Sequence, residues 1–374
     1  MAQNALLFVG SINRATGYFA TAEGEGISVF TFDEENGLAT LQSVFKGIDN
    51  PTFIAVDRQQ HLLFATSEVY GWNEGVVTAL RFDARTGALS YLNKQATLGS
   101  IAAHAGTDHS GRYVLVTNYA HESKWAGFYG EDVPGQATAV FPIEERGWLG
   151  AAISSIAHKG SSENPARQNE PHPHCAIVSP DNRFVLIADL GIDAVVIYGF
   201  AEGRLTRTSA FSLPPGSGPR HLKFAPNGRS VYVISELAST VAHLAYNAQT
   251  GELTQQQVVS TLPAGFSSEN HCSELQISGD GAFLYGANRG HDSLAIFHID
   301  PDDGSLEAIG HVPCGGVTPR NFGLSPSGSH LLVANQNSRT VAIFRRDASN
   351  GMLEQSGALE VGSPMVIAMV PAEG

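Results

Sequence analysis

Three charged residues stand out because of where they fall in a repeated pattern. Arg220, Glu236 and Arg289 occupy positions at which most equivalent segments of the chain carry other residue types, so the repeat itself does not require them. A carboxylate can transfer a proton in acid–base catalysis, and guanidinium groups bind anions and stabilise a developing oxyanion. The three residues therefore form a candidate catalytic group. Because buried arginine and glutamate must be paired, a purely structural ion pair is the alternative interpretation.

The pattern itself is a gapless segment of 17 residues that occurs six times, and Ala5–Ser11 matches the second half of a seventh copy. After each copy comes another short apolar run and then a glycine, and these glycines recur about every 52 residues. The six copies are Pro51–Ser67, Ala102–Asn118, Pro173–Asp189, Pro219–Ser235, Cys272–Asn288 and Pro319–Asn335, and the glycines are Gly37, Gly87, Gly147, Gly203, Gly251, Gly304 and Gly351.

The repeat predicts an all-β fold. Its apolar runs are short, rich in Val, Ile, Leu and Phe, and bounded by turn residues, which is typical of strands. About four strands in about 50 residues is the size of a propeller blade. We therefore expect a seven-bladed β-propeller of four-stranded antiparallel blades, with residues 1–374 as a single domain. The apolar tail Ala358–Val370 is expected to pair with the N-terminal segment and close the ring, which removes an exposed edge. A solenoid of β repeats is the alternative, although its coils are usually shorter.

Matching repeat positions form rings around the axis of a propeller, so each position can be compared around the ring. The residue that follows the six full copies is, in order, Glu68, Tyr119, Leu190, Glu236, Arg289 and Gln336. We expect this end of the copy to meet its beginning at one channel mouth, rich in His, Arg and Glu. The predicted substrate-binding residues are Glu68, His104, Asn118, His174, Arg320 and Gln336. Because Asn118 recurs as Asn288 and Asn335, capping of a turn is its alternative role.

Other candidate features are weaker. His172 and His174 lie two residues apart, but no third ligand has a compelling spacing, so no metal site is predicted. One repeat is longer than the others, through Ala120–Gly135 and Ser154–Pro171, which lack strand patterning and are expected to be loops. Long loops on a rigid scaffold often carry function, and tolerated surface insertions are the alternative.

Composition excludes several classes of function. The 22 Lys and Arg against 36 Asp and Glu give a net charge of −14, which argues against nucleic-acid binding. Apolar runs are too short to cross a membrane. Three cysteines and the lack of a recognisable signal peptide lead us to expect a cytoplasmic protein. Neither a GxGxxG loop opening a helix nor a GxSxG elbow occurs, so we expect no nucleotide cofactor, indeed no cofactor at all, and no serine nucleophile of that type.

Four segments together resemble the lactonase family of seven-bladed propellers, which includes propeller-type 6-phosphogluconolactonases and fungal carboxymuconate-cyclising enzymes. The resemblance covers essentially the whole chain and implies a functional cluster at His172, Arg220, Glu236 and Arg289. The long loops are the departure, and they leave the substrate open. The segments are EPHPHCAIVSPDNRFVLIADLG (Glu170–Gly191), GSGPRHLKFAPNGRSVYVISE (Gly216–Glu236), NHCSELQISGDGAFLYGANRGHDSLAIF (Asn270–Phe297) and TPRNFGLSPSGSHLLVANQNSRTVAIF (Thr318–Phe344).

The resulting expectation is a hydrolase that opens a sugar lactone, phosphorylated or not, by metal-independent acid–base catalysis resembling that of a 6-phosphogluconolactonase. Glu236 or His172 would be the general base or acid, and Arg220 and Arg289 would bind the anionic group and the oxyanion. The alternatives are a lactone-forming cyclase or isomerase acting on an unsaturated dicarboxylate, and a non-catalytic propeller that binds a protein or glycan. The expected ligand is a small anionic or sugar lactone, and the protein could be a monomer or a dimer.

Overall fold

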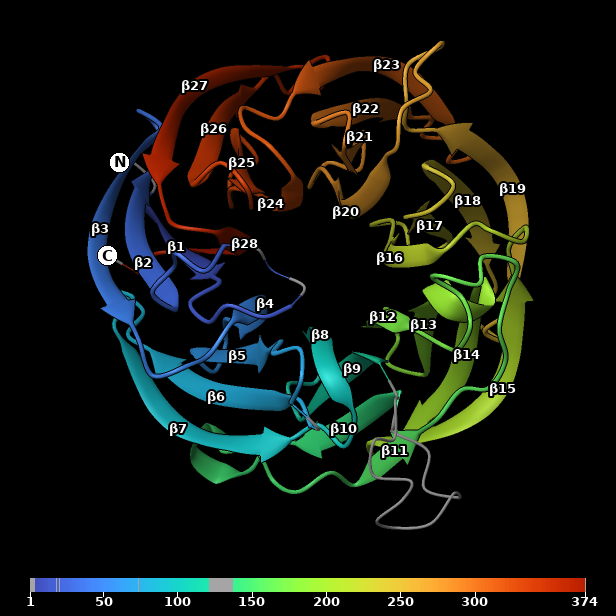
Figure 1. Cartoon of the computed structure of the whole chain (residues 1–374), viewed down its shortest axis with the longest axis horizontal. Coiled ribbons are helices and arrows are strands. Elements are labelled where there is room, and N and C mark those ends of the chain that lie inside the picture. Colours follow the sequence, from blue (N-terminus) through green and yellow to red (C-terminus); the bar gives the residue numbers. More distant parts are fainter. Residues whose placement is uncertain (1–3, 18, 20, 73, 121–136, 374) are drawn as a thin grey trace.

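Seven antiparallel sheets of four strands each surround a central axis (Figure 1). The structure is a computed structural model that describes residues 4–17, 19, 21–72, 74–120 and 137–373. In each sheet the innermost strand lines the axis and the outermost faces solvent. The predicted all-β, seven-bladed propeller is therefore confirmed.

Each blade runs from an innermost strand at the axis to an outermost strand at the surface. In that order, the first three blades are β28 (Pro364–Pro371), β1 (Asn4–Ser11), β2 (Ile27–Asp33) and β3 (Leu38–Phe45); β4 (Pro51–Asp57), β5 (Leu62–Ser67), β6 (Val76–Phe82) and β7 (Leu89–Ala96); β8 (Ser100–Thr107), β9 (Tyr113–Ala120), β10 (Thr138–Pro142) and β11 (Ser154–Ile156). The next two are β12 (Pro173–Val178), β13 (Phe184–Asp189), β14 (Ala194–Ala201) and β15 (Arg204–Ser212); β16 (Pro219–Phe224), β17 (Ser230–Ser235), β18 (Thr240–Tyr246) and β19 (Leu253–Ser260). The last two are β20 (His271–Ile277), β21 (Phe283–Arg289), β22 (Ser293–Ile299) and β23 (Leu306–Pro313); β24 (Pro319–Leu324), β25 (His330–Asn335), β26 (Thr340–Arg346) and β27 (Leu353–Glu360). Within the described ranges, two short 3₁₀ turns lie at Glu145–Gly147 and Leu190–Ile192.

Burial follows the position of a strand in its blade. The second strands, such as β5 and β17, are buried along their whole length, because both of their faces pack against neighbouring blades. The outermost strands, such as β19, alternate between exposed and partly buried residues, as a sheet edge with one solvated face should. The hydrophobic core is therefore divided into layers between adjacent blades; one such layer packs Leu186 of β13 against Val231 and Val233 of β17.

The innermost strand carries an irregularity at the same place in five blades. In β16 the pairing with β17 is Pro219 with Ser235 and then His221 with Ile234, so Arg220 is an extra, unpaired residue. The residues skipped in the same way in the other four blades are Thr52, Ala103, His174 and Arg320. Such β-bulges turn a side chain away from the regular alternation of the strand. The predicted meeting of the two ends of each copy at one mouth is confirmed, because Pro219 pairs with Ser235, the neighbour of Glu236.

The ring closes as expected. β28 pairs with β1 in an antiparallel register that runs from Ala5 with Pro371 to Ser11 with Pro364, so the two ends of the chain share one blade. The seven turn glycines all have φ between 68° and 81°, which residues other than glycine adopt only with strain. At Gly351 an added Cβ would also lie 2.3 Å from Cδ1 of Phe283 in the neighbouring blade.

The long repeat differs from expectation in one place. Ser154–Ile156, predicted as the beginning of a loop, forms the outermost strand β11 and pairs with Thr138–Val140 of β10. The edge of β10 needs a backbone partner, and this requirement outweighs the weak strand propensity of two serines. Most of the other predicted loop, Ala120–Gly135, lies outside the described residues.

Candidate active site

A buried carboxylate surrounded by three guanidinium groups lies at one end of the channel. Oε1 of Glu236 is 2.6 Å from Nη2 of Arg167. Oε2 of Glu236 is 2.9 Å from Nε of Arg220 and 2.8 Å from Nη2 of Arg289. The side chains of Glu236 and Arg220 are only 5% and 3% exposed, whereas that of Arg167 is 31% exposed. Arg167 is therefore the member of the cluster that reaches solvent.

This arrangement fixes the charge of Glu236. Burial alone would raise the pKa of its carboxyl, but Arg289, Arg220 and Arg167 together hold that pKa far below the usual range. Burial also lowers the pKa of Arg220, and the nearby cations of Arg289 and Arg320 lower it further. The cluster thus carries one negative and three positive charges, which leaves an excess of two positive charges at the mouth. Such an excess attracts an anion or a developing oxyanion.

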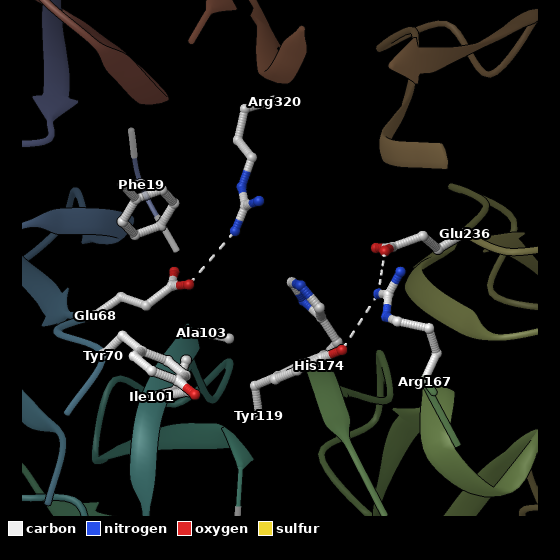
Figure 2. Close-up of a pocket in the computed structure, with 10 residues that line it drawn as sticks. All are labelled: Phe19, Glu68, Tyr70, Ile101, Ala103, Tyr119, Arg167, His174, Glu236 and Arg320. Carbon is white, nitrogen blue, oxygen red and sulfur yellow. Dashed lines mark hydrogen bonds and ion pairs between the residues drawn. The ribbon is translucent and has the colours of Figure 1, made fainter. Parts of the chain in front are cut away.

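A cavity opens beside this cluster, and a second ion pair lies on its opposite wall (Figure 2). Nη2 of Arg320 is 3.5 Å from Oε1 of Glu68, and the guanidinium of Arg320 also lies 5.9 Å from the ring of Phe19. The ten residues that line the cavity combine these charged groups with aromatic and apolar side chains, and they are Phe19, Glu68, Tyr70, Ile101, Ala103, Tyr119, Arg167, His174, Glu236 and Arg320.

His172 lies behind Tyr119 and is not among the residues that line this cavity. Its Nδ1 is 2.8 Å from the backbone carbonyl oxygen of Tyr119, and the two rings stack with centroids 4.6 Å apart. Because a carbonyl oxygen can only accept, Nδ1 of His172 carries the proton. In the neutral ring Nε2 then holds the lone pair, which is the form that a general base requires. The hydroxyl of Tyr119 in turn lies 3.3 Å from Nη2 of Arg167, which connects His172 to the charged cluster.

His174 and His221 are neutral histidines in the deeper part of the channel. Burial, followed by the charge of Arg220, holds the pKa of His174 well below its usual value. Burial lowers the pKa of His221 to about 4, although Glu274 opposes this shift. His221 bridges two charged groups, with Nδ1 3.2 Å from Oε2 of Glu274 and Nε2 3.3 Å from Nη1 of Arg220. The neutral ring therefore donates to Glu274 and accepts from Arg220.

The structure brings together most of the predicted site residues. Arg220, Glu236 and Arg289 form one cluster, and Glu68, His174 and Arg320 line the adjacent cavity. The alternative of a structural ion pair describes part of this geometry, since every charge in the cluster has a partner. The excess of cations over carboxylates is what points beyond a structural role.

Three predicted binding residues lie elsewhere. Asn118 is fully buried, and its amide donates to the backbone oxygen of Thr97 over 2.9 Å, which favours its alternative role as a turn cap. The amide nitrogen of Gln336 donates to Asn337, and Gln336 does not line the cavity. His104 follows the bulge residue Ala103 in β8 and lines a different cavity, toward the other end of the channel.

Sequence reasoning did not select Arg167, Tyr119, Phe19 or Tyr70 as site residues. Arg167 lies in the long segment Ser154–Pro171, whose length was the one available signal. Tyr119 occupies the same repeat position as Glu236, but an aromatic residue there carried no chemical meaning until its contact with Arg167 was known. Among the described residues, no group of three or more His, Cys, Asp or Glu side chains is placed to hold a metal ion.

Comparison with known proteins now identifies the family. A family model described as "Lactonase, 7-bladed beta-propeller" matches residues 7–369. The chain belongs to this family. A 6-phosphogluconolactonase of Bacillus subtilis is 34% identical over 83% of this chain and 84% of its own, and one of Formosa agariphila is 32% identical over 86% of both chains. The structure of a periplasmic gluconolactonase of Pseudomonas aeruginosa, 32% identical, superposes with a TM-score of 0.88 over 99% of this chain and all of its own.

The family assignment confirms the resemblance carried by the four sequence segments. Within the described residues, no helix is long and apolar enough to cross a membrane. The expected cytoplasmic location stays a prediction, since one similar structure is that of a periplasmic protein.

Proposed function

We propose that this protein hydrolyses a phosphorylated sugar lactone without a metal ion, with water activated by a general base and the oxyanion stabilised by arginine. The observation that carries the proposal is the group of three guanidinium groups around Glu236 at the mouth of a lactonase-family propeller. Relatives of similar length are named 6-phosphogluconolactonase, which supports the reaction and the substrate class.

His172 is the proposed general base. Glu236 is a poor candidate, because the lowered pKa of its carboxyl leaves it little tendency to take up a proton at neutral pH. The same argument applies to His174, whose pKa burial and Arg220 depress. His172 carries its proton on Nδ1 and so offers Nε2 to a water molecule. In this scheme Glu236 orients the three arginines, and Arg167, the most exposed of them, contacts the carbonyl oxygen of the lactone as it becomes an oxyanion.

Arg320 is the proposed contact for the phosphate of the substrate. The cavity and its surroundings hold four guanidinium groups, from Arg167, Arg220, Arg289 and Arg320, against the two carboxylates of Glu68 and Glu236. Arg320 lies on the wall opposite the cluster, so a sugar could span the distance between the reacting carbonyl and this residue (Figure 2). Guanidinium groups suit phosphate because their donors match two of its oxygens.

A matched pair of histidine variants tests the base. We expect His172→Gln to lower kcat by about 100-fold or more, within the usual range for a general base, and His174→Gln to lower it by less than about tenfold. Steady-state kinetics on 6-phosphogluconolactone, with and without a chelator, would measure both effects. A larger loss in His174→Gln than in His172→Gln, or a loss of activity on chelation, would contradict the mechanism.

A substrate pair tests the class of lactone. We expect kcat/KM for 6-phosphogluconolactone to exceed that for gluconolactone by more than about tenfold, since one good ionic contact contributes at least about 1.4 kcal/mol. Arg320→Met should remove most of this preference by raising KM for the phosphorylated substrate alone. Equal activity on both lactones in the unmodified enzyme would show that the phosphate is not recognised.

A further inference from the structure

The channel contains a second cavity, at the end opposite the candidate active site. It has a volume of about 300 Å³, which is the lower end of the range for small-molecule sites. Lys223 lies three residues after Arg220 along the innermost strand β16, a distance of about 10 Å. The lining residues are Phe53, Ile54, His104, Ala105, Gly106, Thr107, His109, Ala176, Ile177, Val178, Lys223, Glu274, Gln276, Asn321, Val366 and Ile367.

A layer of four rings, three buried and that of Phe53 partly buried, lies between the two cavities. The ring of His221 lies 5.8 Å from that of His104 and 5.9 Å from that of Phe53, measured between centroids. His221 also lies 5.1 Å from His174, which lines the candidate active site. These four residues lie on the innermost strands of four different blades, β4, β8, β12 and β16. A molecule in the second cavity would therefore contact a different set of side chains from the lactone.

Lys223 lines this cavity, and its ammonium group has no hydrogen-bond or ion-pair partner among the described residues. Lys223 is half-buried, and its backbone pairs with Tyr232 of β17. Glu274, the other charged group, is 1% exposed and already accepts from three donors: Nδ1 of His221, Nδ2 of Asn321 and the backbone nitrogen of Leu275. The ammonium group of Lys223 is thus free to bind a ligand, whereas the carboxylate of Glu274 is occupied within the protein.

His104 supplies a second, independent sign of a ligand. It is 5% exposed, it lines the cavity, and its Nδ1 is buried with no hydrogen-bond partner among the described residues. Buried polar groups are nearly always hydrogen-bonded, so an unpaired one beside a cavity indicates a missing partner. Burial holds the pKa of His104 well below its usual value, so the ring is neutral and can donate or accept one hydrogen bond.

We propose that this cavity is a second small-molecule site, which binds a hydroxylated carboxylate through the ammonium group of Lys223 and polar contacts from His104 and Gln276. A single cation beside the carboxylate of Glu274 suits a monoanion better than a phosphate dianion, which Glu274 would repel. The apolar walls formed by Ile177 and Ile367 accommodate the carbon chain. This site differs from the mouth around Glu236, where two positive charges are in excess.

Isoleucine methyl groups report on the two cavities separately. Ile54, Ile177 and Ile367 line the second cavity, and Ile101 lines the candidate active site. We expect titration with gluconate, a hydroxylated monoanion, to shift the NMR signals of the first three methyl groups in a saturable way. The apparent Kd from these signals should differ from that given by Ile101. Sorbitol, the neutral analogue, should bind at least about tenfold more weakly at the second cavity.

Two lysine variants complete the test. Lys223→Met should weaken the gluconate response of Ile54, Ile177 and Ile367 at least about tenfold and leave that of Ile101 and the lactonase kcat unchanged. Lys94→Met, which removes an exposed lysine on the outermost strand β7, should leave the gluconate response of all four methyl groups unchanged. The proposal is overturned if the three methyl groups do not respond to gluconate, if Lys223→Met responds like the unmodified protein, or if sorbitol binds as well as gluconate. The methyl-group readouts do not depend on the identity of the lactone, so they test the second site even if the proposed function fails.

Discussion

Two buried glutamates at opposite ends of the channel, Glu236 and Glu274, are bound by different kinds of donor. Glu236 is bound by three guanidinium groups, whereas Glu274 is bound by a neutral imidazole, an amide and a backbone nitrogen. The first arrangement leaves a surplus of positive charge that can act on a substrate. The second uses neutral donors and leaves Lys223 apart. The same blade scaffold therefore builds a charged mouth and a nearly neutral one.

The largest expected effect separates the two glutamates by the same substitution. We expect Glu236→Gln to lower kcat/KM by about 100-fold or more, and to lower the free energy of unfolding by about 3 kcal/mol, because the three guanidinium groups, of which Arg167 is the most exposed, lose their counterion. Glu274→Gln should cost less than about tenfold in kcat/KM, since its amide oxygen still accepts from His221. Lactone hydrolysis and urea unfolding of both variants would measure these effects.

The comparison fails if the two variants behave alike. Circular dichroism should first show that both fold. An equal loss of activity would mean that the second glutamate is as closely tied to the reaction as the first, and that the charge surplus at Glu236 is not what matters.

The next effect concerns acid stability, to which both ends contribute. His104, His174 and His221 have folded-state pKa values lowered by burial, so below about pH 6.5 the unfolded chain binds protons that the folded protein does not. The free energy of unfolding should therefore fall as the pH decreases, by about 1.4 kcal/mol per pH unit for each histidine between about pH 6 and pH 5. Urea unfolding at several pH values would measure this slope.

Histidine variants locate the slope in the channel. His104→Gln at one end and His174→Gln at the other should each reduce the slope of unfolding free energy against pH by about 1.4 kcal/mol per pH unit, which corresponds to one bound proton. A slope that stays the same in the double variant would place the acid sensitivity elsewhere, for example in the carboxylates of the turns.

The smallest effect tests whether the two ends communicate through His221. His221 accepts from Arg220 on one side and donates to Glu274 on the other, so it positions Arg220. We expect His221→Leu to lower kcat by about tenfold with a change in KM of less than about threefold, because the oxyanion contacts weaken more than substrate binding. His221→Gln, whose carbonyl oxygen can accept from Arg220, should keep kcat within about threefold of the unmodified enzyme.

The decisive comparison is whether His221→Gln keeps the kcat that His221→Leu loses. If leucine and glutamine are equally harmful, the residue matters only for packing. If both are harmless, Arg220 is positioned without it.

The sequence repeat predicted the ring because every blade forms its strands and turns from the same pattern of residues. Alternation of short apolar runs with turn glycines specifies strands, and the common register follows from it, as with Pro219 and Ser235. The β-bulges could not be predicted from single residues, since Thr52, Ala103 and Arg220 share no side-chain property. A bulge turns Arg220 toward the mouth and leaves the next residue, His221, facing deeper. That is also why His104, predicted beside the mouth, lines the other cavity.

Singular residues in a repeat were a good guide to the charged cluster but an incomplete one. Arg220, Glu236 and Arg289 were found because most other blades carry different residue types at those positions. Arg167 has no counterpart in other blades, because it comes from an inserted segment, so comparison among repeats could not select it. Its role depends on a contact between segments 69 residues apart, which only the folded chain defines.

The blade that joins β1 to β28 has a consequence for the synthesis of the chain. β1 is made before the other six blades, and its inner partner, Pro364–Pro371, is made after them, so this blade stays incomplete while the other six are assembled. During that time the inner edge of β1 offers unpaired backbone groups to any strand nearby. A second copy of the chain carries the same strand β28. If two chains exchanged β28, the β1 of each chain would pair with the β28 of the other. Because exchange needs a second chain, a low concentration of chains during folding would protect correct assembly more than added stability of the finished ring.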